Sequence, residues 1–539
     1  MKQKTLDQLE SEKQKIARRL EDAKDGMKPR GEGPEFSAPR ARYEFSERVH
    51  ATSYGGIGVV HNLVRTLGLP ELIDEWLPLL KQHRPYHESD HILNITYNFL
   101  CGGRVLDDLE LLRNDATYLD ALGARAIPDP TTAGDFCRRF TADDVGALMG
   151  IINDVRTDVW RRRGAELLEQ QAVIDVDSTI VATTGECHEG MGLSYKGVWG
   201  YHPLIVSLAN TSEPLFVVNR SGNRPSSEGA AEVIDDAVEL CRRAGFERVL
   251  VRGDTAFSTT AHFDSWTDDG VRFVFGYMAC AALKDRADEL PDGEYEALVR
   301  KAERALANAE TKTRAKQARA KQPRVKQRIV RERGYKNIKL ESEQVAEFEH
   351  SPGRAQKSYR MIVLRKKLIE ERGQLCLGTS VRYFFYVTND PDLTAEQVVF
   401  HANERCNQEN LIAQLKGGVN SLKGPLNKFV ANWALMVMAS LAWTLKAWLA
   451  LSLEPSPEHL DGSGPDVDAD SDSDADSDVD ANSTEEERDR ILRMDFRTFV
   501  RNFMLVPTQI LYRGRQLIYR ALAWRPGLKF MFKVAECST

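Results

Sequence analysis

The spacing of apolar and polar positions changes along the chain and separates a helical part from a mixed part. Between residues 57 and 163, apolar residues recur at helical spacing, as in "HNLVRTLGL" and "ELIDEWLPLL". The same part contains "DPTTAGDFCRRF", where Thr131 or Thr132 can cap a short helix. This pattern predicts an all-helical domain.

From residue 171 the pattern changes to short β-rich runs. Strands are predicted at "AVIDVD", "PLIVSLA", "PLFVVNR", "RVLVRGD" and "VRFVFGY", with helices at 229–243 and 259–268 before the last two. The order β, β, β, α, β, α, β indicates a mixed sheet with helices on its faces. The predicted fold class is α/β within an α+β multidomain chain.

An insertion is predicted to split this sheet domain. Residues 280–340 are polar, Ala-rich and basic, which favours helix, and "YRMIVLRKK" and "VRYFFYVTN" predict two further strands. The next helix is predicted to begin near Thr394. The insertion, of about a hundred residues, is therefore expected to be a small α+β unit.

The segment 429–453 is long and apolar enough to cross a bilayer. It contains Asn432 and Lys446 and has no companion spans. We therefore predict a buried core helix.

Charge is strongly separated along the chain, although the net charge is only -7. Residues 300–339 hold 15 Lys and Arg against 3 acids, whereas residues 461–487 hold 12 acids and no base. The basic stretch is a candidate for binding a polyanion, and the acidic one is predicted to be disordered. Residues 488–539, with 11 bases against 3 acids, are predicted to pack on the core and face a polyanion; a solvated cationic helix is the alternative.

The eight cysteines form no C-x-x-C pair and have no clustered His partners. This spacing argues against a zinc module and for reduced, buried thiols. The chain is charged from Lys2 onward, so no signal peptide is predicted and a cytoplasmic location is expected.

Three acids stand where a divalent-metal site needs them. Asp175 and Asp177 end "VIDVD" two positions apart, so they share one face of a strand, and Asp254 ends "RVLVRGD". An Asp at a strand end commonly only starts a turn. Two such ends at one sheet edge could share a magnesium ion.

The stretch "RCNQENLIAQLK" contains three further charged residues. On a helix, Arg405, Glu409 and Lys416 fall within about 40° of one another. An ordinary solvated ion pair is the simplest interpretation. The alternative is catalytic: phosphodiester chemistry uses two metal ions about 3.5–4 Å apart, held by carboxylates, and cations beside them can hold phosphates.

This set of residues resembles the DDE transposases of bacterial insertion sequences, in particular the branch with the signature Y-x2-R-x3-E-x6-K. Arg405, Glu409 and Lys416 match its last three positions, and Ala402 stands in place of the Tyr. "DSTIV" and "RGDTAF" are similar to the motifs of the first two acids, and "GVWGYHPLIV" and "NRSGN" are also typical of the family.

The resemblance implies an RNase H-like core and a role for each site residue. Asp177, Asp254 and Glu409 would bind two Mg2+ ions, for which Mn2+ could substitute, and Arg405 and Lys416 would contact DNA phosphates. The Ser and Thr after Asp177 favour it as the first acid over the reserve, Asp175. His202 is a further auxiliary candidate. It could equally be a core histidine whose hydrogen bonds are all made within the protein.

The implied function is cut-and-paste transposition of an insertion sequence: cleavage of terminal inverted repeats and strand transfer into target DNA. A homodimer on double-stranded DNA, in the cytoplasm of a bacterium or archaeon and associated with its nucleoid, is expected. The alternatives are a non-catalytic domesticated DNA-binding protein and a metal-dependent DNA nuclease. Relatives with a long insertion before the last acid often form a hairpin, for which Tyr335 or Tyr359 could supply a stacking ring.

Seven segments are predicted. They are a charged helix and linker (1–45), a helical DNA-binding domain (46–165), the first part of the catalytic core (166–279), the insertion domain with its basic stretch (280–390), the last part of the core with the buried helix (391–455), a disordered acidic loop (456–487) and a basic C-terminal segment (488–539).

Overall fold

The structure is a computed structural model that describes most of the 539-residue chain. The described residues are 3–25, 49–183, 185–298, 329–333, 336–372, 375–453, 484–513 and 516–537. The predicted linker at 26–42, most of the basic stretch and most of the acidic loop lie outside these ranges.

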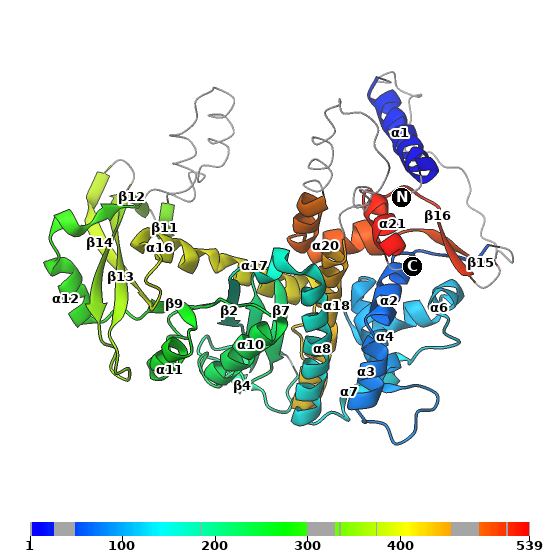
Figure 1. Cartoon of the computed structure of the whole chain (residues 1–539), viewed down its shortest axis with the longest axis horizontal. Coiled ribbons are helices and arrows are strands. Elements are labelled where there is room, and N and C mark those ends of the chain that lie inside the picture. The colour runs from blue at the N-terminus through cyan, green and yellow to red at the C-terminus, as the bar shows by residue number, and fades with distance from the viewer. Residues whose placement is uncertain are drawn as a thin grey trace, which may run out of the picture.

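A mixed sheet forms the centre of the molecule (Figure 1). Its core strands are β2 (Ala172–Ser178), β6 (Leu204–Leu208), β7 (Glu213–Val218), β8 (Val249–Gly253) and β9 (Arg272–Tyr277). They lie in the order β7-β6-β2-β8-β9, antiparallel from β7 to β2 and parallel from β2 to β9. Two helices, α10 (Ala230–Ala244) and α11 (Phe263–Asp268), occupy the predicted positions between strands. The predicted α/β fold class, a mixed sheet with helices between its strands, is confirmed.

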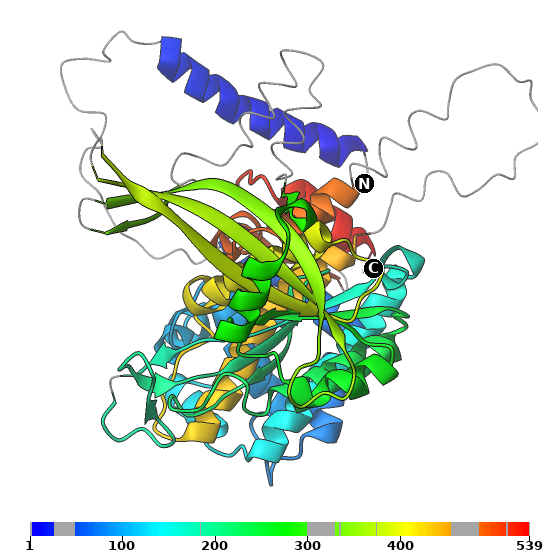
Figure 2. The ribbon, with the colours of Figure 1, turned by 90° about the vertical axis from the view of Figure 1, so that its left-hand side faces the viewer.

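The insertion extends this sheet instead of forming a separate one. Its long strands are β12 (Lys336–His350), β13 (Tyr359–Arg372) and β14 (Leu375–Thr388). Strand β14 pairs antiparallel with β9, so the core sheet continues into the insertion, and the short β10 (Glu296–Ala297) and β11 (Ile329–Arg333) pair with β12. Figure 2 shows these long strands with α12 (Ala281–Glu289) lying across them.

The two strands predicted inside the insertion are therefore confirmed, but the helix predicted for residues 280–340 is wrong at β10, at β11 and at its end. Residues 336–340 begin β12, where they pair with residues 368–372 of β13. A polar, Ala-rich composition favours helix locally. The long partner strand decides the outcome, because pairing depends on contacts that are distant in sequence.

The apolar helix α18 (Phe429–Leu451) is the centre of the helical part. Among the described residues, it is the one helix long and apolar enough to span a membrane, and its most apolar window is entirely buried. It contacts α4 (Glu88–Leu100), α8 (Ala142–Arg163) and β7. The predicted buried core helix is confirmed, and in Figure 1 it stands between the sheet and the N-terminal helices.

Smaller helices complete the N-terminal layer. They are α2 (Ile57–Thr66), α3 (Leu69–Trp76), η1 (Leu106–Asp108), α5 (Leu109–Arg113), α6 (Ala116–Leu122), α7 (Pro130–Cys137) and α9 (Ala165–Leu168). The cap of α7 is Asp129, whose carboxylate accepts the Thr132 N–H at 2.9 Å, so the prediction of Thr131 or Thr132 as the cap is wrong. Pro130 occupies the first helical position, where a backbone N–H would have no partner within the helix. The cap is therefore the residue before it, Asp129.

The C-terminal segment returns to the N-terminal part of the chain. A hairpin of β15 (Thr508–Arg513) and β16 (Gln516–Ala521) adds β1 (Ala51–Thr52) at its edge, and α20 (Phe496–Phe499) and α21 (Leu528–Cys537) flank it. Phe496, Phe499 and Phe530 are buried in the main hydrophobic core, as predicted for a segment that packs on the core. Residues 484–492 are helical, so the last four residues of the predicted disordered loop belong to a helix.

Two further details concern the chain as a whole. The charged helix predicted at the start of the chain is α1 (Gln3–Asp25), which is largely exposed. The prediction of buried thiols holds for Cys101, Cys137 and Cys241, which are free and buried, and is wrong for three exposed ones, Cys187, Cys280 and Cys406.

Candidate active site

The register of the sheet brings two of the predicted acids to one edge. Strands β2 and β8 are parallel, with Val176 opposite Gly253, so the next residues, Asp177 and Asp254, leave the two strands side by side. Neighbouring strands lie about 4.8 Å apart. The carboxyl ends of parallel strands are where open α/β sheets bind ligands.

Helical segments carry the third acid over this edge. Thr394 caps α16 (Ala395–Glu404) through a hydrogen bond from the Gln397 N–H, which confirms the predicted start. The helix is not continuous: it is interrupted at Arg405, and α17 (Cys406–Ala413) carries Glu409. A π-helix (Gln414–Val419) follows and carries Lys416.

Gln408 fixes α17 against the sheet. It is buried, its Nε2 donates to the Ile205 carbonyl of β6 at 3.1 Å, and its Oε1 accepts the Ser207 hydroxyl. Glu409 is the next residue and is exposed. The buried amide of Gln408 therefore sets the position from which Glu409 projects, and no sequence signal distinguishes it from any other polar helical residue.

The two predicted phosphate clamps already contact the end of β2. Arg405 Nη1 lies 3.2 Å from Asp177 Oδ2, and Lys416 Nζ donates to the Ile180 carbonyl at 2.7 Å. Thus both cations reach the same edge despite the break in the helix. Burial lowers the pKa of Lys416, and the nearby Lys196 lowers it further.

Asp177 is the electrostatic centre of this group. Burial raises its pKa, while Arg405 and the Ser178 N–H, which donates to Oδ1 at 2.7 Å, lower it. The charges of Asp254 and Glu409 raise the pKa again. The mutual repulsion of these three acids favours a cation between them.

The acids offer hard oxygen donors, which suit Mg2+ or Mn2+. Asp254 uses Oδ1 to accept the Ala256 N–H at 2.8 Å and keeps Oδ2 for a ligand. The carboxylates of Asp177, Asp254 and Glu409 do not all lie within 4.8 Å of one another: in the described part of the chain, that spacing is found only for His83, His87 and Glu88. The donor chemistry of the three carboxylates fits divalent ions.

Asp175, the reserve for the first acid, has a different environment. It is buried against Arg252 of β8, whose Nε and Nη2 donate to its two oxygens at 2.7 and 2.8 Å. Burial raises the pKa of Asp175, and the two hydrogen bonds from Arg252 oppose that shift. Arg252 could not be recognised from the sequence, because the pairing depends on the register between two strands.

The remaining candidates, His202 and Tyr359, make hydrogen bonds to neighbouring groups of the protein. His202 is buried, with Nδ1 2.9 Å from the Arg224 carbonyl and Nε2 3.0 Å from the Ser178 hydroxyl, so it holds the residue next to Asp177. Burial lowers its pKa. Tyr359 is buried and donates its hydroxyl to Asp264 at 2.7 Å, which leaves no free ring for a base.

Two sequence features need separate mention. Ala402, in place of the signature Tyr, lies on α16 and packs against a small apolar cluster that includes Val398 and Val399. Tyr335 lies outside the described residues.

Comparison with known proteins identifies the family. Residues 47–459 match the family model for the transposase DDE domain, group 1. This chain belongs to that family. DDE transposases generally use divalent metal ions, which agrees with the donor set at this edge of the sheet.

Other comparisons add less. No curated protein matches this DDE transposase. Seven chains of solved structures match, among them a piggyBac transposase in a synaptic complex with hairpin DNA. The two chains are 10% identical, the match covers 81% of this transposase and 80% of that chain, and the TM-score is 0.33.

Proposed function

We propose that this chain is a cut-and-paste transposase, which cleaves the inverted-repeat ends of a DNA element and joins them to target DNA. The observation that carries the proposal is that Asp177 and Asp254 lie at the ends of adjacent parallel strands, and that Glu409 of α17 is near enough to interact electrostatically with Asp177. The DDE family assignment supports transposition over a simple nuclease.

Asp177, Asp254 and Glu409 are proposed to hold the divalent ions. When bound, such ions activate the attacking oxygen and stabilise the leaving oxygen of a phosphodiester. The surrounding residues of the chain set the geometry: Gln408 orients Glu409, and His202 with Ser178 holds the end of β2.

Arg405 and Lys416 are proposed to contact the DNA backbone. Arg405 Nη1 lies 3.2 Å from Asp177 Oδ2, at the edge of the sheet where the three acids lie. The guanidinium would be able to bind a phosphate there through two hydrogen bonds. Lys416, half-buried, places one positive charge beside the same edge.

The proposed substrate is double-stranded DNA, and two chains are proposed to act together on the two ends. Mass measurement by light scattering, with and without an inverted-repeat duplex, tests this arrangement. We expect two chains per complex with DNA. A single chain on each duplex, even when two ends are joined in one reaction, would contradict it.

The decisive experiment is cleavage of a labelled inverted-repeat end in the presence of Mg2+. Wild type and Glu232→Gln, which changes an exposed acid of α10, should cut at the repeat boundary, and Glu409→Gln should not. Binding without cleavage by all three proteins would instead support a DNA-binding protein without catalysis. Cleavage that ignores the repeat boundary would support a nuclease.

The route of cleavage is a separate proposal, suggested by the separation of 155 positions between Asp254 and Glu409. We propose a hairpin intermediate. A denaturing gel of the products decides it: hairpins migrate differently from linear strands of the same sequence, and their absence at every time point would exclude this route.

A further inference from the structure

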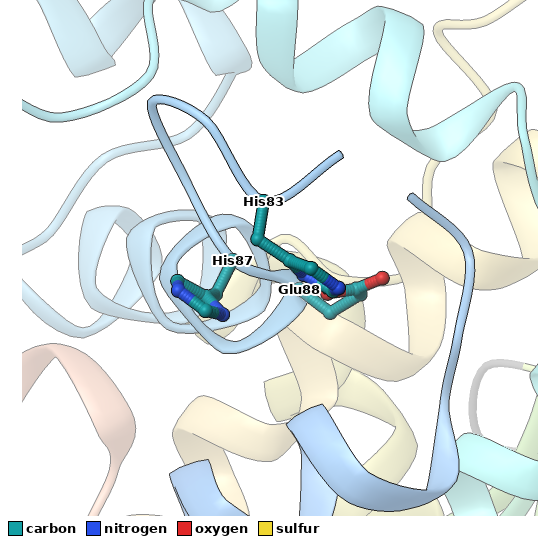
Figure 3. A group of neighbouring side chains, drawn as sticks. All are labelled: His83, His87 and Glu88. Atoms are coloured by element: carbon teal, nitrogen blue, oxygen red, sulfur yellow. The ribbon is translucent and has the colours of Figure 1, made fainter. Parts of the chain in front are cut away.

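A second group of metal-binding side chains lies in the helical layer, outside the catalytic edge. His83 and His87 belong to the segment between α3 and α4, and Glu88 is the first residue of α4. One ligand atom from each of the three lies within 4.8 Å of the other two. Figure 3 shows the His83 ring against the Glu88 carboxyl group, with His87 beside them.

The buried carboxylate is the strongest part of this group. Glu88 is fully buried, and its Oε1 accepts the Leu80 N–H at 2.7 Å. Its Oε2 accepts no hydrogen bond and lies 3.1 Å from His83 Nδ1, an ion pair only when that ring is protonated. A buried carboxylate oxygen that accepts no hydrogen bond and faces a neutral ring is costly. A cation between His83 and Glu88 would remove this cost.

The distances suit a zinc ion. With bonds of about 2.0–2.1 Å and tetrahedral angles, two zinc ligands lie about 3.3 Å apart, close to the separation of His83 Nδ1 and Glu88 Oε2. His87 is exposed and its ring stacks on that of His83, with centroids 4.8 Å apart. An adjustment of this exposed side chain would complete three ligands, and a water molecule would fill the fourth position.

A neighbouring acid can orient His87. Asp74 of α3 accepts the Ser89 N–H and hydroxyl at 2.8 and 2.9 Å, which holds its carboxylate at the start of α4. Its Oδ2 lies 3.8 Å from His87 Nδ1, beyond hydrogen-bond distance, so Asp74 attracts this side of the ring while Nε2 can face a metal. Histidine ligands in metal sites commonly have such a carboxylate on their other nitrogen.

We propose that His83, His87 and Glu88 form a binding site for a divalent cation of intermediate hardness, chiefly Zn2+. Two imidazoles and one carboxylate favour Zn2+ over Mg2+, so the site differs in chemistry from the three acids at the sheet edge. A bound ion would fasten the segment between α3 and α4 to the start of α4, which packs on the core helix α18. The site is independent of the proposed transposition.

Calorimetric titration of Zn2+ into the full-length protein, stripped by a chelator and kept in excess Mg2+, tests the proposal. We expect one saturable Zn2+ per chain, with binding at least about tenfold weaker in His83→Ala and in His87→Ala. Glu88→Gln keeps the acceptor for Leu80 and should weaken binding similarly. His50→Ala, an exposed histidine outside the group, should bind like wild type.

Two controls distinguish binding at this site from misfolding of the variants and from zinc binding by cysteines. Thermal unfolding of the stripped variants shows whether they fold, and Zn2+ should raise the melting temperature of wild type but not that of His83→Ala. The Co2+ form should have a visible spectrum without thiolate charge-transfer bands. Equal Zn2+ uptake by wild type and His83→Ala, or a thiolate spectrum in wild type, would overturn the proposal.

Discussion

Arg252 binds Asp175 through two hydrogen bonds, from Nε and Nη2, and both side chains are at most 3% exposed. The pair joins β2 to β8, and Arg252 Nη1 also donates to the His401 carbonyl at the end of α16. Two acids two positions apart on one strand therefore have different tasks. Asp175 holds the sheet and the helix together, and Asp177 is left to face the open edge.

The first prediction separates Asp175 from Asp177. Asp175→Asn leaves the buried Arg252 guanidinium with only the half-exposed Glu404, at 3.6 Å, as a counter-charge, which should lower the free energy of unfolding by about 3 kcal/mol. Asp177→Asn removes a carboxylate that is repelled by two others and should change stability by no more than about 1 kcal/mol, while it abolishes cleavage. Urea unfolding and the cleavage assay measure the two effects.

A double-mutant cycle controls this comparison. Replacing both partners, as Asp175→Asn with Arg252→Met, should recover part of the stability lost in Asp175→Asn, because no buried charge remains unpaired. Loss of cleavage in a stably folded Asp175→Asn protein would contradict the assignment, since it would make Asp175 a member of the catalytic set.

The second prediction concerns Arg405. If it contacts a phosphate, Arg405→Ala should weaken DNA binding and reduce the slope of log K against log salt by about 0.9. Arg405→Lys should keep the slope but lose affinity, because an ammonium group cannot bind a phosphate through two parallel hydrogen bonds as a guanidinium can. Arg161→Ala, an exposed arginine of α8, is the control. An unchanged slope in Arg405→Ala would leave Arg405 only as the partner of Asp177.

The parts of the fold that the sequence predicts are those with strong local signals. The apolar runs that end at Asp177 and Asp254 predict both strands, and Thr394 predicts the start of α16, because each signal lies within a few residues. The parts that it does not predict depend on distant contacts. The pairing of β14 with β9 and the Arg252–Asp175 ion pair are set by strand register, which no local pattern contains.

The candidate site follows the same division. Helical spacing places Arg405, Glu409 and Lys416 on one stripe, but the helix breaks at Arg405 and becomes a π-helix at Gln414. The cations reach the sheet edge through specific contacts, such as that of Lys416 with the Ile180 carbonyl. The spacing therefore identifies candidate residues, and only the tertiary structure gives their partners.

The third prediction concerns Glu213, which connects the sheet to the helical layer. This fully buried carboxylate accepts hydrogen bonds from Arg156 Nε at 3.0 Å, Trp160 Nε1 at 2.9 Å and Trp448 Nε1 at 2.8 Å. Glu213→Gln removes the counter-charge of a buried arginine and turns an amide donor toward other donors. We expect a loss of about 3 kcal/mol in the free energy of unfolding.

Urea unfolding measures that loss. The matched control is Glu228→Gln, because Glu228 is an exposed acid paired with Arg224 at the surface and its replacement should cost no more than about 0.5 kcal/mol. A cost for Glu213→Gln as small as that for the control would show that the buried network contributes nothing specific to the contact between sheet and helices.

The fourth prediction concerns the pH dependence caused by Lys446. This residue of α18 is fully buried, its Nζ donates to the carbonyls of Leu492 and Met494 at 2.9 and 2.8 Å, and it lies 3.6 Å from the centre of the Trp443 ring. Burial lowers its pKa from 10.5 to about 7, and Asp495 opposes the shift. Either form of the amine can make both hydrogen bonds, since the neutral form still has two N–H groups.

The sign of the effect follows from proton binding. Between about pH 7 and the pKa of the unfolded chain near 10.5, the unfolded state holds the proton and the folded state does not, so stability rises with pH. Relative to Lys446→Met, wild type should gain up to about 1.4 kcal/mol per pH unit in this window and show no such slope below it. Urea unfolding at several pH values measures the difference, with Lys428→Met, an exposed lysine at the start of the same helix, as the control. A difference that stays constant as the pH rises would mean that Lys446 remains charged in the folded protein, held by its two carbonyls and the Trp443 ring.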